Sequence, residues 1–87
     1  MVTLTKEGFR SDVEMQTALL DAERLRKRVT FYTRTRRFID RFRCIDTENK
    51  PITLDRFVCH GGLIYYKKNE FEWNNISLDD VIKVEIA

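Results

Sequence analysis

Three side chains in this sequence have the chemistry to bind a metal or attack a substrate: Cys44, Cys59 and His60. A structural zinc site needs four ligands, and a cysteine nucleophile needs a base that a third group orients. The sequence contains no Cys-x-x-Cys pair, and two adjacent strand residues such as Cys59 and His60 point to opposite faces. We therefore predict no catalytic residue, no metal site and no cofactor. We expect Cys44 to be a small buried hydrophobic residue and to form no disulfide with Cys59.

A second chemical feature is the positive charge in the middle of the chain. The net charge is +2, but residues 24–43 hold nine basic residues against one acid, and the segments on both sides are acidic. Arginine beside an aromatic ring suits single-stranded RNA. An acidic protein partner is one alternative, and a solvated face that the acidic flanks neutralise is another. The candidate contacts are Arg34, Arg36, Arg37, Arg41 and Arg43.

The composition indicates one small globular domain, residues 1–87. Hydrophobic residues make up 43% and charged residues 34%, and there are only three Gly and one Pro, which excludes disordered, collagen-like and linker-like chains. No apolar run is long enough to cross a membrane, and the first residues lack the apolar stretch of a signal peptide. We therefore expect an intracellular location and no membrane partner.

A helix followed by short strands would position these residues. Residues 1–10 are expected to form a flexible arm, and Ser11 with Glu14 forms a capping-box pattern that predicts a helix over 11–28. Apolar residues then recur at three- and four-residue steps and predict one buried stripe. The stripe consists of Met15, Ala18, Leu19, Ala22, Leu25 and Val29.

Residues 29–87 are expected to form a small barrel. The pattern predicts strands at 29–33 and 38–45 with a turn at 33–37, and a third strand from 52 toward 60. Gly61 and Gly62 predict a tight hairpin turn, and further short strands follow up to residue 86. One helix followed by five or six such strands predicts a mainly β fold with a five-stranded SH3-like barrel.

This order of elements resembles the Sm/LSm family over residues 29–86. Val29-Thr30-Phe31, Phe38-Ile39-Asp40-Arg41-Phe42 and Ile45-Asp46 resemble parts of its first motif, and residues 76–82 resemble its second. The resemblance implies a barrel of Sm type. Asp40 stands where the family has Gly, which suggests either a gentler bend of the strand or a carboxylate turned toward Arg41 or Arg37. The Met-Asn and Arg-Gly pairs of the family are missing, so its uracil pocket is not implied.

Two groups share parts of this pattern. Arg28-Val29-Thr30-Phe31 and Asp79-Asp80-Val81-Ile82 resemble Gemin-type Sm-like subunits of the SMN complex, in particular the seventh Gemin. This resemblance implies a non-catalytic subunit in snRNP assembly, upstream of mRNA splicing, in cytoplasm and nucleus. Its partner would be another Sm-like protein in a hetero-dimer, with RNA contact indirect. The alternative is the bacterial YolD-like family, which Ile45-Asp46 through Asp55 resembles.

The expected protein interface lies in the last two strands. In Sm-like assemblies the fourth strand of one subunit pairs with the fifth strand of the next, and here both strands are apolar and expected to have no cover. The aromatic residues of segment 63–73 are expected to divide between core and contact. The alternative function is direct RNA binding by the arginines. The interface residues are Ile76, Leu78, Val81, Ile82, Val84 and Ile86.

Overall fold

The computed structural model describes residues 1–6 and 9–87, and the side chains of 1–6 and 12–87. Its strands are β1 (Val2–Thr5), β2 (Val29–Asp40), β3 (Arg43–Glu48), β4 (Ile52–Leu54), β5 (Val58–His60), β6 (Leu63–Lys67), β7 (Trp73–Ser77) and β8 (Val81–Ile86). The helix α1 (Phe9–Arg24) precedes β2, and a 3-10 turn (Leu78–Asp80) precedes β8. Among the described residues, no helix has the length and apolar character needed to cross a bilayer.

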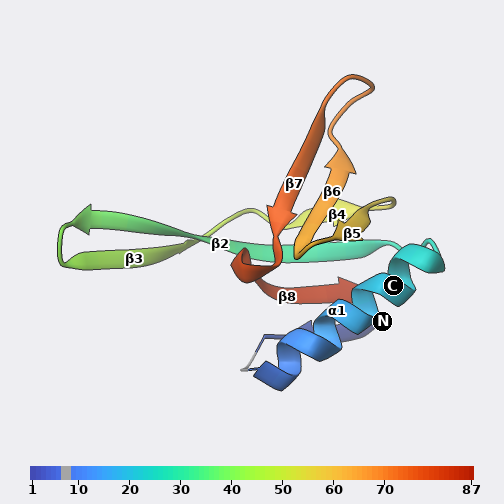
Figure 1. Ribbon diagram of the computed structural model, residues 1–87, viewed down its shortest axis with the longest axis horizontal. Helices are drawn as coiled ribbons and strands as arrows, with labels where there is room; N and C mark the ends of the chain where they lie inside the picture. The colour runs from blue at the N-terminus through green and yellow to red at the C-terminus, as the bar shows by residue number, and fades with distance from the viewer. Residues whose placement is uncertain (7–8) are drawn as a thin grey trace.

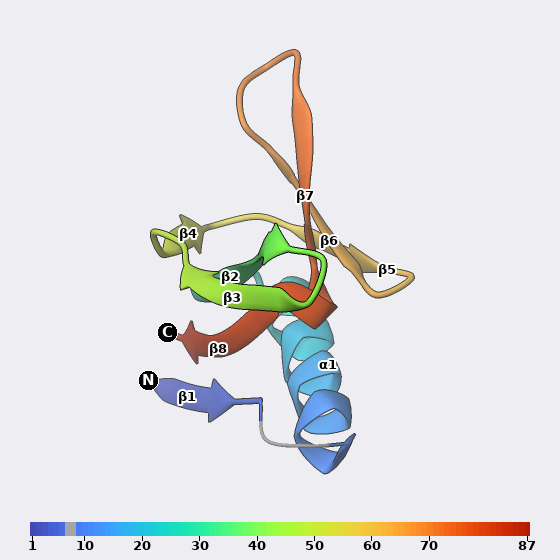
Figure 2. The same ribbon diagram turned by 90° about the vertical axis from the view of Figure 1, so that its left-hand side faces the viewer.

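The strands form two antiparallel sheets. One has five strands in the order β1-β8-β2-β3, with β4 beside the first residues of β2, and the other has the order β5-β6-β7. Figures 1 and 2 show that the β2–β3 and β6–β7 hairpins project from the body in different directions. The expected mainly β class with one N-terminal helix is therefore confirmed, as a curled antiparallel half-barrel.

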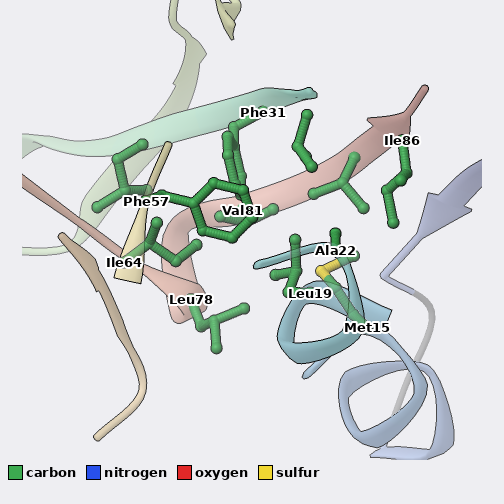
Figure 3. Packing of buried hydrophobic residues seen from close by; sticks show 12 residues of the cluster. Met15, Leu19, Ala22, Phe31, Phe57, Ile64, Leu78, Val81 and Ile86 are labelled. Carbon is green, nitrogen blue, oxygen red and sulfur yellow. The ribbon is translucent and has the colours of Figure 1, made fainter. Parts of the chain in front are cut away.

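The helix buries the predicted stripe but ends earlier than expected. Met15, Leu19 and Ala22 are buried against the sheets (Figure 3). Arg26 has a φ of 54°, its N–H donates to Glu23 O, and the N–H of Lys27 donates to Ala22 O. These bonds form a Schellman motif, which stops the helix near Arg24 instead of 28 and leaves Leu25 exposed. The predicted start at Ser11 was also wrong, since α1 already begins at Phe9; the Ser11 side chain lies outside the described residues.

The core joins α1 to both sheets. Phe31 of β2 packs edge-on against Phe57, with ring centroids 5.5 Å apart, and Ile64 of β6 is fully buried in the same cluster. Gly61 and Gly62 have φ values of 59° and 75°, which confirms the predicted tight turn between β5 and β6.

Residues 2–5 form a strand, where we had expected a flexible arm. β1 pairs with β8 so that Leu4 lies opposite Val84, and Leu4 packs against the core. Lys6 extends this contact, because its N–H donates to Ile82 O at 3.0 Å and its Nζ donates to Leu78 O at 2.7 Å. These bonds hold the first residues of the chain against its last strand.

β2 continues through the turn that was predicted at 33–37. Asn49 holds this stretch: its N–H donates to Thr33 O, and its side-chain amide bonds to the hydroxyls of Thr33 and Thr35. The strand runs to Asp40, where the chain reverses. The predicted third strand is divided into β4 and β5, so the short strands at 52–54 and 58–60 belong to different sheets.

Candidate functional site

The outer part of the β2–β3 hairpin is an arm without a core. We call residues 34–48 the hairpin arm; every residue in it is exposed. Its two strands pair with each other from Arg34 opposite Glu48 to Asp40 opposite Arg43, with a bulge between Phe38 and Asp40. An isolated two-stranded hairpin is only marginally stable in water. The arm therefore depends on its turn, on cross-strand pairs and on whatever it contacts.

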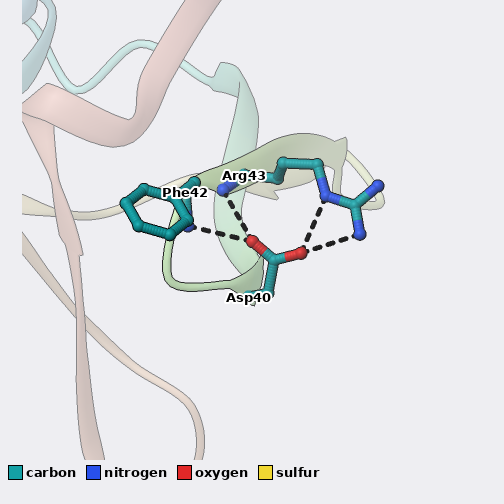
Figure 4. Close-up of polar contacts among 3 residues, drawn as sticks. All are labelled: Asp40, Phe42 and Arg43. Atoms are coloured by element: carbon teal, nitrogen blue, oxygen red, sulfur yellow. Dashed lines mark hydrogen bonds and ion pairs between the residues drawn. The ribbon is translucent and has the colours of Figure 1, made fainter.

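Asp40 organises the turn at the end of the arm. One carboxylate oxygen accepts the N–H groups of Phe42 and Arg43 at 2.9 and 3.1 Å, and the other accepts Arg43 Nε at 2.8 Å (Figure 4). The backbone bond from Phe42 and the bond from Arg43 lower the pKa of the Asp40 carboxyl. The carboxylate is thus turned to Arg43, and not to Arg41 or Arg37 as expected.

The candidate arginines are largely paired within the arm. Arg34 and Arg36 both lie near the Asp46 carboxylate, at 3.3 and 3.6 Å, and Arg43 pairs with Asp40 at 2.7 Å. Arg37 and Arg41 have no acidic partner among the residues that the structure describes. The structure therefore places the five arginines on one arm and pairs three of them with acids of the same arm.

The tip of the arm is apolar on both faces. Cross-strand register puts Phe38 and Cys44 on one face and Ile45 on the other, with Phe42 in the turn. Phe42 is 89% exposed and Phe38 is 77% exposed, and Cys44 is also exposed. The prediction that Cys44 is buried was wrong, because alternation identifies a face but not whether anything covers it. Sequence analysis had singled out the arginines of this segment and missed its apolar residues.

Most of the predicted interface residues lie in the core. Val81, Val84 and Ile86 are buried, as are Ile76 and Leu78, while Ile82 is half-buried. β8 is paired on both sides, by β1 and by β2. Lys6 is hydrogen-bonded to Ile82, and hydrogen-bonded pairs recur every second residue along an antiparallel ladder. Leu4 and Val84 are therefore also a hydrogen-bonded pair. The expected uncovered edge of the last strand is therefore absent, since β1 occupies it.

An open edge is present on β7 instead. The N–H of Lys68 donates to Glu72 O and that of Leu78 donates to Gly62 O, each at 3.0 Å. Hydrogen-bonded and non-hydrogen-bonded pairs alternate along an antiparallel ladder. Between these two bonds, the N–H and C=O groups of Asn74 and Ile76 therefore point toward β6. The N–H and C=O groups of Trp73, Asn75 and Ser77 therefore point away from β6. The signal in the sequence was a five-residue strand, Trp73–Ser77, without a charge or a proline.

A groove is lined by residues 53–58, by Lys67 at the end of β6 and by Trp73 at the start of β7. Leu54, Phe57, Val58 and Trp73 give it apolar walls, and its volume is about 740 Å³. Lys67 Nζ lies 5.4 Å from the centre of the Trp73 ring, so this aromatic surface already accepts a cation. The aromatic segment is divided: Tyr66 packs against the core, whereas Phe71 and Trp73 are exposed.

The residues with nucleophilic or metal-binding chemistry are not brought together. Both cysteines are free thiols. Burial, with a smaller contribution from Glu23, raises the pKa of the Cys59 thiol to about 11, and Glu23 accepts the N–H of Cys59 at 2.7 Å. Within the described part of the chain, no three His, Cys, Asp or Glu side chains are placed to hold a metal ion.

Comparison with known proteins finds no matching family model, no matching curated protein and no matching solved structure.

Proposed function

We propose that this chain is a non-catalytic Sm-like assembly subunit that accepts a β-strand of another protein at the edge of β7. The observation that carries the proposal is the unpaired side of Trp73–Ser77. Proteins normally protect such an edge with charges, proline or a bulge, and the residues of β7 supply none of these. A partner strand would gain main-chain hydrogen bonds there, and side-chain contacts would set its register.

The nature of the partner follows from the resemblance in the sequence. An Sm-like subunit would pair with another Sm-like protein as a hetero-dimer, inside an RNA–protein assembly complex of the snRNP type, in cytoplasm and nucleus. The helix over two curled antiparallel sheets supports the finer assignment of an Sm-type barrel. The YolD-like family is the alternative assignment and is compatible with the same edge contact.

Substitution at Asn75 tests this proposal. Asn75→Pro removes an N–H that points outward and spares the ladder with β6, a position where an edge strand tolerates proline. Asn75→Ala is the matched control, because it keeps the N–H and removes only the side chain. Each tagged full-length variant is purified from its own cells, and the mass of the native complex is measured after circular dichroism has shown an intact fold.

We expect the wild type and Asn75→Ala to carry a partner and Asn75→Pro to lose it. A folded Asn75→Pro protein that keeps the same complex would contradict edge pairing at β7.

Direct RNA binding is the second candidate. It is favoured by Arg37 and Arg41, which have no acidic partner among the residues described and lie next to the exposed Phe38 and Phe42. Two phosphate contacts on a single strand predict a slope of about −1.4 for the logarithm of the binding constant against the logarithm of salt concentration. The double variant Arg37→Glu, Arg41→Glu should then abolish binding and leave the β7 complex intact. A salt-independent or absent RNA affinity in the wild type excludes this candidate.

A further inference from the structure

The single chain exposes more surface than a compact protein of its mass. A folded monomer of 10.5 kDa is expected to expose about 5,400 Å². This chain exposes 6811 Å², with a radius of gyration of 13.6 Å against about 12 Å for a compact domain of this length. The excess is roughly 1,400 Å², and a stable complex buries about 800 Å² on each partner. The excess area is therefore enough for a dimer interface.

The tip of the hairpin arm concentrates exposed apolar side chains. Phe38, Ile39, Phe42 and Ile45 are all exposed, and they lie on both faces of the tip and in its turn. A hairpin that is apolar on one face can lie on a flat surface. Apolar residues on both faces are covered only when the tip inserts between two walls.

The groove lined by Trp73 offers such walls. Its volume of about 740 Å³ is within the range of 300–1,000 Å³ that is typical of binding pockets. Val58 and Trp73, which line it, are exposed, and Trp73 already lies under the Lys67 ammonium. The groove also holds the charged residues Asp55, Arg56 and Lys67, so its apolar walls match the aromatic rings of the tip and not the arginines beside them.

We propose that the arm tip of one copy of this chain inserts into the Leu54–Phe57–Val58–Trp73 groove of a second copy, and that the second copy does the same in return. Both surfaces are then covered in one closed dimer with a two-fold axis, which is the commonest symmetry of soluble oligomers. The contact uses the Trp73 ring, whereas the edge contact uses the β7 backbone. The dimer and the edge contact are therefore independent of each other.

Sedimentation of the purified full chain tests the dimer. We expect a wild-type dimer, and at least about a 100-fold weaker one for Phe42→Ser and for Val58→Lys, because each substitution removes a central contact twice per dimer. Val13→Lys is the control, since Val13 lies on α1 and is exposed to a similar degree, 52% against 47% for Val58. A wild-type monomer at 100 µM, or a dimer that survives either substitution, overturns the proposal.

Disulfide trapping identifies the two surfaces. Cys44 lies at the arm tip, so Val58→Cys should give a covalent dimer through Cys44 of the other copy under mild oxidation. Adding Phe42→Ser should remove the product, and Val13→Cys should not give it. Dimers that form without this disulfide show that the tips meet each other or another surface, and this result also overturns the proposal. Whether or not this disulfide forms, Asn75→Pro is still expected to lose the partner at the β7 edge.

Discussion

Leu19 and Leu20 are neighbours on α1 with opposite environments, and truncating each one measures how strongly the helix holds the fold. Leu19 is 0% exposed and belongs to the buried cluster with Met15 and Phe31, whereas Leu20 is 51% exposed. Leu19→Ala leaves a cavity that the surrounding side chains close only in part. The same chemical change at Leu20 leaves a position that water already reaches.

The expected loss for Leu19→Ala is about 2–5 kcal/mol of unfolding free energy. An 87-residue domain has a total of about 4–13 kcal/mol, so the loss is a large fraction of it. The melting temperature should fall by roughly 8–40 °C, since 1 kcal/mol corresponds to about 4–8 °C in a domain of this size. Leu20→Ala should cost less than about 0.5 kcal/mol.

Urea unfolding followed by circular dichroism measures both variants. The midpoint should shift for Leu19→Ala with an unchanged slope, because the surface exposed on unfolding stays nearly the same. Equal losses at the two positions would refute the assignment of Leu19 to the core, and so would a larger loss at Leu20. A loss below about 1 kcal/mol at Leu19 would show that α1 does not pack tightly on the sheets.

Three further predictions concern Asp40, Cys59 and Leu4. Asp40→Ala should speed amide exchange at the arm tip. The fold lowers the pKa of Asp40, so its carboxylate stabilises the tip at pH values above its ordinary pKa of 3.8. This stabilisation is lost as the pH falls through the lower pKa of the folded state, and the wild-type tip should therefore also loosen in acid. With its pKa raised to about 11, Cys59 is about 0.1% thiolate at pH 8, and alkylation followed by mass spectrometry should label Cys44 far faster; equal rates would contradict the burial of Cys59. Leu4→Pro should cost about 1–3 kcal/mol, since it removes a ladder bond to β8 and half-buried apolar surface, and light scattering should show increased association through the bared edge of β8.

Local patterns in the sequence correctly predicted the features that depend only on the backbone conformation of neighbouring residues. The stripe through Met15, Leu19 and Ala22 is buried as predicted, because side chains three and four residues apart share one face of any helix. Gly61 and Gly62 form the predicted turn because a positive φ is a property of the backbone at those two positions. The early end of α1 was missed, since Arg26 takes the left-handed position that a glycine would have marked.

The hairpin arm shows what alternation leaves undecided. The predicted single strand over 38–45 was wrong, because the chain reverses after Asp40 and puts Phe38 in β2 and Cys44 opposite it in β3. The turn position was wrong because cross-strand contacts of Asn49 and Asp46 keep residues 33–37 extended. The exposure of the tip was missed for a related reason, since a strand pattern identifies two faces but not what lies against them.

The sequence by itself determined the class of this protein: one N-terminal helix, a mainly β remainder, and a buried stripe that joins them. Only the tertiary structure decided which strand edge is open. Val2 lies opposite Ile86, and this pairing of the two ends of the chain covers the last strand, whereas β7 lies at the edge of the other sheet. Edge strands have the same local propensities as central ones, so the choice depends on contacts between residues far apart in the chain, which no local pattern records.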